Sequence, residues 1–150
     1  MRPLSELFGN VVFQTVIAGV LVFAFSEMLQ KFLLEPIKEF KGIIGKIDNR
    51  LKFFANVISN ATPSSKMLPE VNTLLRQLSC DLESAYKMMP FKWALSILRM
   101  IPSQKQIASA AKGLIFVSNA TGEPSQRHVV EKEVEKVRNL LRIPKYNGSE

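Results

Sequence analysis

The first part of the chain is a long apolar run. From Leu7 to Ser26 the sequence contains no Asp, Glu, Lys, Arg or His. A helix of about 20 residues rises about 30 Å, which matches the hydrocarbon thickness of a bilayer. The pattern therefore predicts a single N-terminal transmembrane helix, within an anchor that covers residues 1–35.

Two alternatives to a membrane anchor fit this run less well. A cleaved secretory signal would carry a basic cluster before its apolar core, whereas here Glu6 stands near Arg2 and the run is longer than the usual signal core. A buried core helix would show a polar stripe, and so short a chain would leave too little protein to cover it. The membrane anchor is therefore the favoured interpretation.

A heptad pattern follows the apolar run. Its apolar residues are spaced alternately four and three apart: Leu33, Ile37, Phe40, Ile44, Ile47, Leu51, Phe54 and Ile58. This spacing predicts that the membrane helix continues as a long amphipathic helix to about Asn60. We expect the stripe to pack against the domain's own helices rather than in an intermolecular coiled coil. Because proline disrupts the preceding turn, Pro36 predicts a kink at the membrane exit.

The rest of the chain also has helical periodicity. Apolar positions from Leu68 to Met89 predict a second long helix, and Pro90 and Pro102 enclose a short segment. Ser103 and Gln106 have the spacing of a capping box that opens a helix to about Asn119. A charged helix ends before Pro144. The predicted fold class is all-α: a transmembrane helix feeding a small cytoplasmic helical bundle over residues 36–144, with a disordered tail at residues 145–150.

Charge sets the expected orientation and partner. The formal net charge is +7, and only Arg2 precedes the span, whereas Lys31, Lys38, Lys41 and Lys46 follow it. Because basic residues favour the cytoplasmic side, we expect the N-terminus outside and the C-terminal domain in the cytoplasm. The basic residues are spread along the chain and interleaved with acidic ones. This distribution favours a surface facing anionic lipid over a nucleic-acid site.

The sequence shows no pattern typical of an enzyme. His128 is the only histidine, which leaves no metal-ligand cluster, and a surface position at the start of a charged helix explains it best. The stretch Gly42-Ile43-Ile44-Gly45-Lys46 is too short for a phosphate loop, and Ile47 stands where a Ser or Thr would be needed. We therefore predict a non-enzymatic protein with no catalytic residues, no bound metal and no cofactor.

Polar and small residues inside the apolar run suggest contacts within the membrane. They are Asn10, Gln14, Thr15, Gly19 and Ser26. Such residues allow transmembrane helices to approach closely and to hydrogen-bond, so they predict a homo-oligomer and, in a narrower form, a polar-lined pore. The alternative is that Asn10 and Gln14 lie near the outer headgroups, where polar residues imply nothing.

The proline-enclosed segment and the helix after it form a second candidate surface. Its residues are Lys92, Trp93, Arg99, Lys105 and Lys112. Aromatic and basic residues on an apolar stretch suit a membrane interface, but Trp93 fits a position over the bundle core equally well. If the domain instead recruits a cytoplasmic protein or senses a small signalling molecule, these basic residues are the first candidates for contact.

Several segments resemble small bacterial membrane proteins of unknown function. The resemblance is carried by Phe32-Leu33-Leu34-Glu35-Pro36-Ile37, by Phe53-Phe54-Ala55-Asn56-Val57, and by Met89-Pro90-Phe91 and Lys112-Gly113-Leu114-Ile115. In layout alone, the chain is similar to the accessory membrane protein of RNA-targeting CRISPR systems, which assembles into a ring-shaped pore. The first resemblance implies no activity. The likeness of layout implies a protein of the bacterial inner membrane that self-associates in antiviral defence. A membrane-anchored adaptor remains the alternative.

Overall fold

The computed structural model describes residues 11–60 and 66–144, and over these ranges the chain is helical with no strand. The all-α fold class is thus confirmed. In chain order the elements are α2 (Val11–Leu29), η1 (Gln30–Leu34), α3 (Glu35–Phe53), α4 (Ala55–Asn60), α5 (Leu68–Met88), α6 (Lys92–Ile97), α7 (Gln104–Ala120), η2 (Pro124–Gln126) and α8 (Arg127–Leu140).

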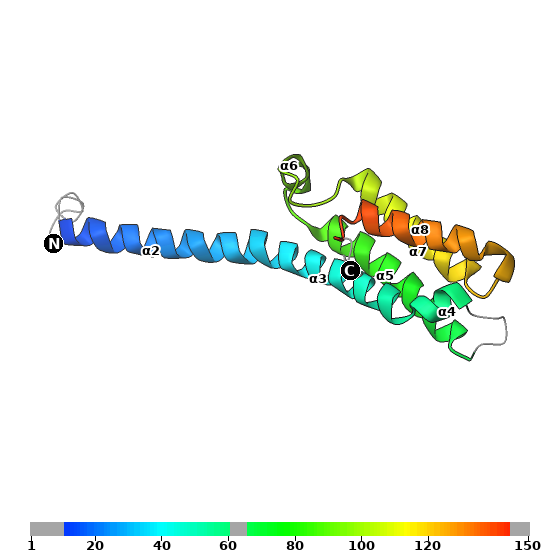
Figure 1. The fold of residues 1–150 in the computed structure, drawn as a ribbon. Coiled ribbons are helices and arrows are strands. Elements are labelled where there is room, and N and C mark those ends of the chain that lie inside the picture. The colour runs from blue at the N-terminus through cyan, green and yellow to red at the C-terminus, as the bar shows by residue number, and fades with distance from the viewer. Residues whose placement is uncertain (1–10, 61–65, 145–150) are drawn as a thin grey trace, which may run out of the picture.

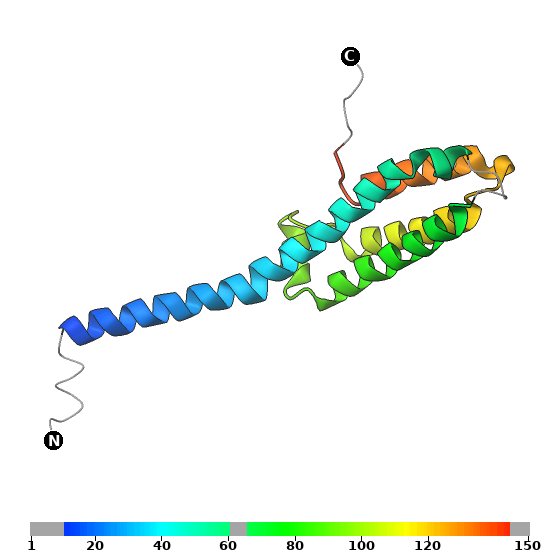
Figure 2. The ribbon, with the colours of Figure 1, turned by 90° about the horizontal axis from the view of Figure 1, so that it is seen from below.

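The first three elements form one continuous rod from Val11 to Phe53. Its first part, α2, projects away from the rest of the molecule and buries none of its residues (Figure 1). Its last part, α3, lies along the helical domain (Figure 2). The same rod therefore contains a segment that contacts no other described element extensively and a segment that belongs to the domain core.

A wider helical turn joins the two parts of the rod. Residues Gln30–Leu34 are π-helical, and the backbone N–H of Glu35 donates to the carbonyl oxygen of Gln30. Pro36 follows in the first turn of α3. Proline lacks a backbone N–H and crowds the turn before it. The π-helical turn directly before Pro36 is one of the usual ways in which a long helix accommodates such a disturbance.

The heptad stripe of α3 is buried against the other helices. Ile37, Phe40, Ile47, Leu51, Phe54 and Ile58 are all at most 6% exposed. Around them, α3 packs on α5, α5 packs on α7 and α7 packs on α8, while α4 contacts α8. The expectation that this stripe packs within the chain's own domain agrees with these contacts.

The helix does not run unbroken to Asn60 as the spacing predicted. Helix α3 ends at Phe53, and Phe54 adopts a non-helical conformation (φ −95°, ψ 13°) before α4 begins. At this interruption the Phe54 ring is buried, with 2% exposed, and the neighbouring Phe53 ring is 68% exposed. The heptad spacing could not show this turn, since Leu51, Phe54 and Ile58 keep the spacing of the apolar stripe across it.

Polar contacts also connect the helices. The Arg76 guanidinium on α5 donates to Asn119 Oδ1 on α7 over 2.6 Å, and the buried Ser79 hydroxyl donates to the Ala111 carbonyl over 3.0 Å. Close α5–α7 packing makes the second bond possible, because Ala110 and Ala111 are fully buried and have small side chains. The predicted capping box is confirmed: Ser103 and Gln106 bond reciprocally at the start of α7.

Candidate functional site

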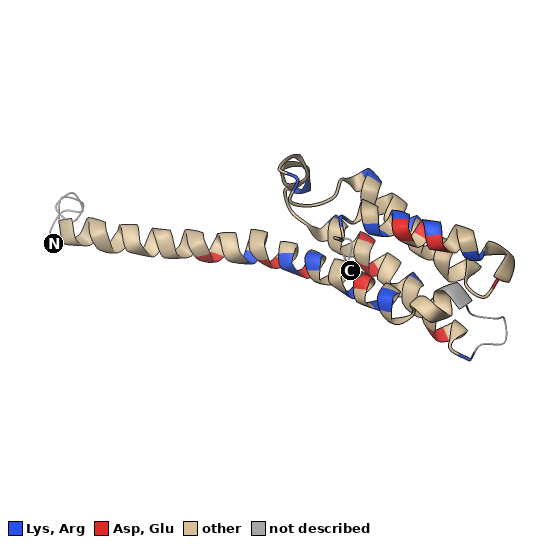
Figure 3. Ribbon diagram, in the orientation of Figure 1, with Lys and Arg blue, Asp and Glu red and all other residues tan. Residues whose placement is uncertain are grey.

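Helix α2 is the most distinctive functional feature of the described chain. Within residues 11–60 and 66–144 it supplies the one helix that is long and apolar enough to cross a membrane. Its large side chains are exposed, with Phe23 at 67%, Leu21 at 63% and Val20 at 61%. In Figure 3 the outer part of the rod carries no charged residue, and the charges begin near the domain.

The two hydroxyl side chains of α2 are bonded within their own helix. The hydroxyl of Thr15 donates to the Val11 carbonyl over 2.8 Å, and the hydroxyl of Ser26 donates to the Val22 carbonyl over 2.8 Å. Such bonds satisfy the hydroxyls without a partner chain. Gln14 is exposed on the same helix. Asn10 lies outside the described residues.

Gly19 lies between Thr15 and Ser26 on one face of α2. A Cβ atom at Gly19 would meet nothing within 4 Å. At the helical repeat of 3.6 residues, Thr15, Gly19, Val22 and Ser26 fall on one stripe. The structure therefore presents a strip of mostly small side chains that no other part of the described chain covers.

Basic residues gather where the rod enters the domain. Lys31 forms an ion pair of 3.2 Å with Glu27, one helical turn earlier. Lys38, Lys41 and Lys46 are exposed along α3. All four predicted juxtamembrane lysines are thus exposed: Lys31 lies in η1, and the other three lie on α3, which packs in the domain.

The short helix α6 exposes most of its apolar side chains. Trp93 is 69% exposed and Ile97 73% exposed, whereas Leu95 is only 4% exposed and fixes α6 to the core. Of the two positions that the sequence allowed for Trp93, the structure shows the exposed one and not the core one. Two residues with positive φ, Phe91 (48°) and Arg99 (57°), stand on either side of α6.

The other residues of this candidate surface are only partly brought together. The Lys92 ammonium lies 5.8 Å from the ring centre of Tyr86, and the Arg99 carbonyl accepts a 2.8 Å hydrogen bond from the Arg142 guanidinium. Lys105 stands in the first turn of α7, and Lys112 lies two turns further along. Lys92, Trp93 and Arg99 therefore form one local surface around α6, from which Lys105 and Lys112 extend along α7.

An open groove between α3 and α5 was not predicted from the sequence. It has a volume of about 600 Å³, and its lining includes Gly42, Gly45, Lys46, Arg50, Leu78 and Asp81. Nothing lies within 4 Å of a Cβ atom built at Gly42 or Gly45. The two glycines within an amphipathic helix were the available sequence signal, because glycine destabilises a helix interior relative to alanine.

His128 was the one histidine available for chemistry. The His128 side chain is 84% exposed at the start of α8, which agrees with the expected surface position, and its Nδ1 lies 3.9 Å from the Glu131 carboxylate. Across residues 11–60 and 66–144, no group of three or more His, Cys, Asp or Glu residues is placed to hold a metal ion.

Comparison of the chain with protein-family models, with curated proteins and with solved structures found no match.

Proposed function

We propose that this is a non-enzymatic protein that α2 anchors in the bacterial inner membrane, with the helical domain in the cytoplasm. The observation that carries the proposal is that α2 buries none of its residues, beside a domain whose core is already filled by other helices. Burying one large apolar side chain contributes ~1.5–3 kcal/mol. The many exposed Val, Leu, Ile and Phe side chains of α2 therefore favour transfer into hydrocarbon strongly.

Two features favour an anchor over the alternatives. A soluble core helix would be buried within the fold, whereas the apolar window of the rod is 0% buried. The rod also continues through η1 into α3, whose Ile37 and Phe40 belong to the domain core. This continuity supports a helix that stays in the protein over a signal that is cleaved, because α2 and α3 are parts of the same helical rod.

The cytoplasmic placement of the domain is supported by the charge distribution. Lys31, Lys38, Lys41 and Lys46 follow α2, whereas Arg2 is the only basic residue before it. Positively charged residues near a span are retained on the cytoplasmic side. The native Cys80 is replaced so that position 38 carries the one cysteine, in Cys80→Ala/Lys38→Cys. Reaction of this variant with a membrane-impermeant maleimide tests the orientation. Labelling only after the cells are opened supports it, and labelling of intact spheroplasts contradicts it.

Self-association through α2 is the second part of the proposal. It is supported by the uncovered stripe of Thr15, Gly19 and Ser26, since small residues let transmembrane helices pack closely. A pore that perturbs the membrane during antiviral defence is the narrower form of this proposal. It takes its support from the sequence resemblance and from Gln14 on the exposed helix surface.

The test is the mass of the intact protein in mild detergent, measured by light scattering. We expect a defined oligomer that Gly19→Leu dissociates, because a large side chain separates the packed helices. Ala24→Leu is the matched control: it adds similar bulk on the opposite face of α2 and should leave the oligomer intact. A monomer in all three proteins contradicts self-association, and only a defined oligomer justifies conductance measurements.

The groove between α3 and α5 favours a second candidate function, a membrane-anchored adaptor. Its opposed charges, Lys46 and Arg50 on α3 and Asp81 on α5, are suited to a polar ligand or a protein segment. Under this alternative, Gly45→Trp would fill the groove and abolish recruitment, whereas Gly19→Leu would have no effect. Loss of function in the cell with Gly45→Trp but not with Gly19→Leu would therefore favour the adaptor, and the reverse result would favour the oligomer.

A further inference from the structure

We propose that α6 lies on the surface of the bilayer that α2 crosses, with its exposed apolar side chains inserted among anionic lipid headgroups. The proposal rests on the proposed function, because it requires α2 to be the anchor. It adds a second membrane contact. The helical domain would be held against the lipid surface by α6 instead of extending freely from the end of the rod.

The burial pattern of α6 is the first argument. Leu95 and Ile101 attach the segment to the core, with exposures of 4% and 1%. The other large apolar residues of the segment point into solvent. They are Phe91, Trp93, Ile97, Leu98 and Met100, and Met88 stands just before them. Because contiguous apolar surface of this kind is unfavourable in water, it marks a contact site.

The position of α6 in the fold is the second argument. The Phe40 ring on α3 lies 6.0 Å from the Tyr86 ring on α5, and the Lys92 ammonium at the start of α6 lies 5.8 Å from the same Tyr86 ring. Tyr86 of α5 thus contacts both Phe40 of α3 and the start of α6. Figures 1 and 2 agree: α6 stands at the end of the domain from which α2 projects.

The third argument is the distance to the lipid. The exposed apolar surface of the rod continues beyond the Glu27–Lys31 ion pair to Leu34, which is 47% exposed. Phe40 follows Leu34 by less than two helical turns, about 9 Å along the axis. A headgroup layer is about 5–8 Å thick, and membrane helices tilt by about 20° on average. A tilt of the rod toward α6 would therefore move α6 toward the headgroups.

Charge identifies the lipid. Arg99 is exposed just after α6, and Lys38 and Lys41 are exposed on α3. The side chain of Lys87 is 75% exposed and forms an ion pair of 3.6 Å with Glu83. Anionic headgroups attract basic residues that lie next to a membrane span. Tryptophan prefers this layer, because its ring is apolar and its indole N–H can bond to headgroups or water. The surface around α6 combines both properties.

The test uses Trp93 as the probe, because it is the only tryptophan of the chain. The full-length protein is reconstituted in phosphatidylcholine–phosphatidylglycerol vesicles, with or without bromine atoms on the acyl chains near the carbonyls. We expect a blue-shifted emission that loses most of its intensity in the brominated vesicles and is protected from acrylamide. A red-shifted emission that acrylamide quenches and bromine does not would overturn the proposal.

A matched control moves the tryptophan to the other end of the domain. In Trp93→Phe/Val129→Trp, the probe replaces Val129, which is 51% exposed near the start of α8, far from α2 (Figure 1). This emission should resist bromine and respond to acrylamide. Equal bromine quenching at both positions would contradict a contact made by α6 in particular. A blue-shifted Trp93 that resists bromine would show cover by protein, such as a second copy, and would also reject the proposal.

Flotation of the same vesicles after an alkaline carbonate wash separates this inference from the anchor. Protein that floats but whose Trp93 resists bromine refutes only the α6 contact. Protein that is washed off refutes the anchor and, with it, the α6 contact.

Discussion

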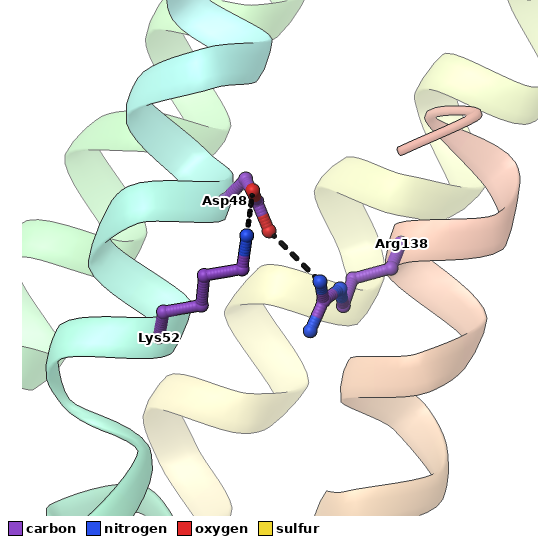
Figure 4. Close-up of polar contacts among 3 residues, drawn as sticks. All are labelled: Asp48, Lys52 and Arg138. Carbon is purple, nitrogen blue, oxygen red and sulfur yellow. Dashed lines mark hydrogen bonds and ion pairs between the residues drawn. The ribbon is translucent and has the colours of Figure 1, made fainter. Parts of the chain in front are cut away.

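Asp48 on α3 pairs with Arg138 on α8, with 3.1 Å between the Asp48 Oδ1 and Arg138 Nη2 atoms (Figure 4). The second oxygen of the same carboxylate lies 2.6 Å from the Lys52 ammonium, one turn along α3. Only 20% of the Asp48 side chain and 25% of the Arg138 side chain are exposed. One carboxylate therefore connects the rod that carries α2 to the last helix of the domain.

We predict that this interhelical pair contributes about 1 kcal/mol to the free energy of unfolding, because it is mostly shielded from water. A double-mutant cycle of Asp48→Asn and Arg138→Gln, followed by denaturant unfolding of the detergent-solubilised protein, measures the coupling. The matched pair is Asp48 with Lys52, whose side chain is 45% exposed. Its coupling should be only about 0.3 kcal/mol, as for other one-turn helix pairs. Equal couplings would show that shielding is unimportant here.

Gly113 is expected to resist substitution. A Cβ atom there would lie 2.5 Å from the Val137 Cγ2 atom of α8 and 3.0 Å from Glu133 Oε1. Val137 is fully buried, so Gly113→Ala should separate α7 from α8 and lower the unfolding free energy by about 1–3 kcal/mol.

Gly45→Ala is the control for that substitution. Position 45 is also helical but open, so alanine should stabilise the protein by up to about 1 kcal/mol. Thermal unfolding followed by circular dichroism compares the two. A stabilising Gly113→Ala would show that α7 and α8 are not packed closely at this point.

The capping box predicts a specific cost at the start of α7. Ser103→Ala removes the hydroxyl that accepts from the Gln106 N–H over 3.4 Å, and should destabilise the protein by about 1 kcal/mol. Ser109→Ala, on an exposed position inside the same helix, should be neutral or slightly stabilising because alanine is the better helix former. Similar effects at both positions in denaturant unfolding would argue against a capping role.

Burial raises the pKa of the Tyr86 phenol above its ordinary value near 10. The folded protein therefore retains the phenolic proton more strongly than the unfolded chain. Stability from this group is fully present below about pH 10 and is lost as the pH rises through the higher pKa of the folded state. Ultraviolet titration of the folded protein, compared with Tyr86→Phe, should assign the late-ionising phenol to Tyr86. If Tyr86→Phe instead removes a phenol that ionises at or below pH 10 from the titration, the prediction is contradicted.

The local and periodic features of this protein are determined by the sequence itself. The uncharged run predicted a helix long enough to cross a membrane. The heptad stripe from Ile37 to Ile58 predicted the buried residues of α3 and α4, apart from Ile44, which is half-buried. Ser103 and Gln106 predicted the start of α7. These features depend on residues within a few turns of one another, so hydrophobic periodicity and capping chemistry are sufficient to find them.

Tertiary structure decided the features that depend on residues far apart in the chain. Trp93 had two equally good positions, and the fold buries Leu95 and Ile101 of the same segment while Trp93 stays exposed. The pairing of Asp48 with Arg138 and the groove between α3 and α5 require α3 to meet helices that follow it by many turns. A sequence pattern states which face of each helix is apolar, but only packing selects which faces meet and which remain exposed.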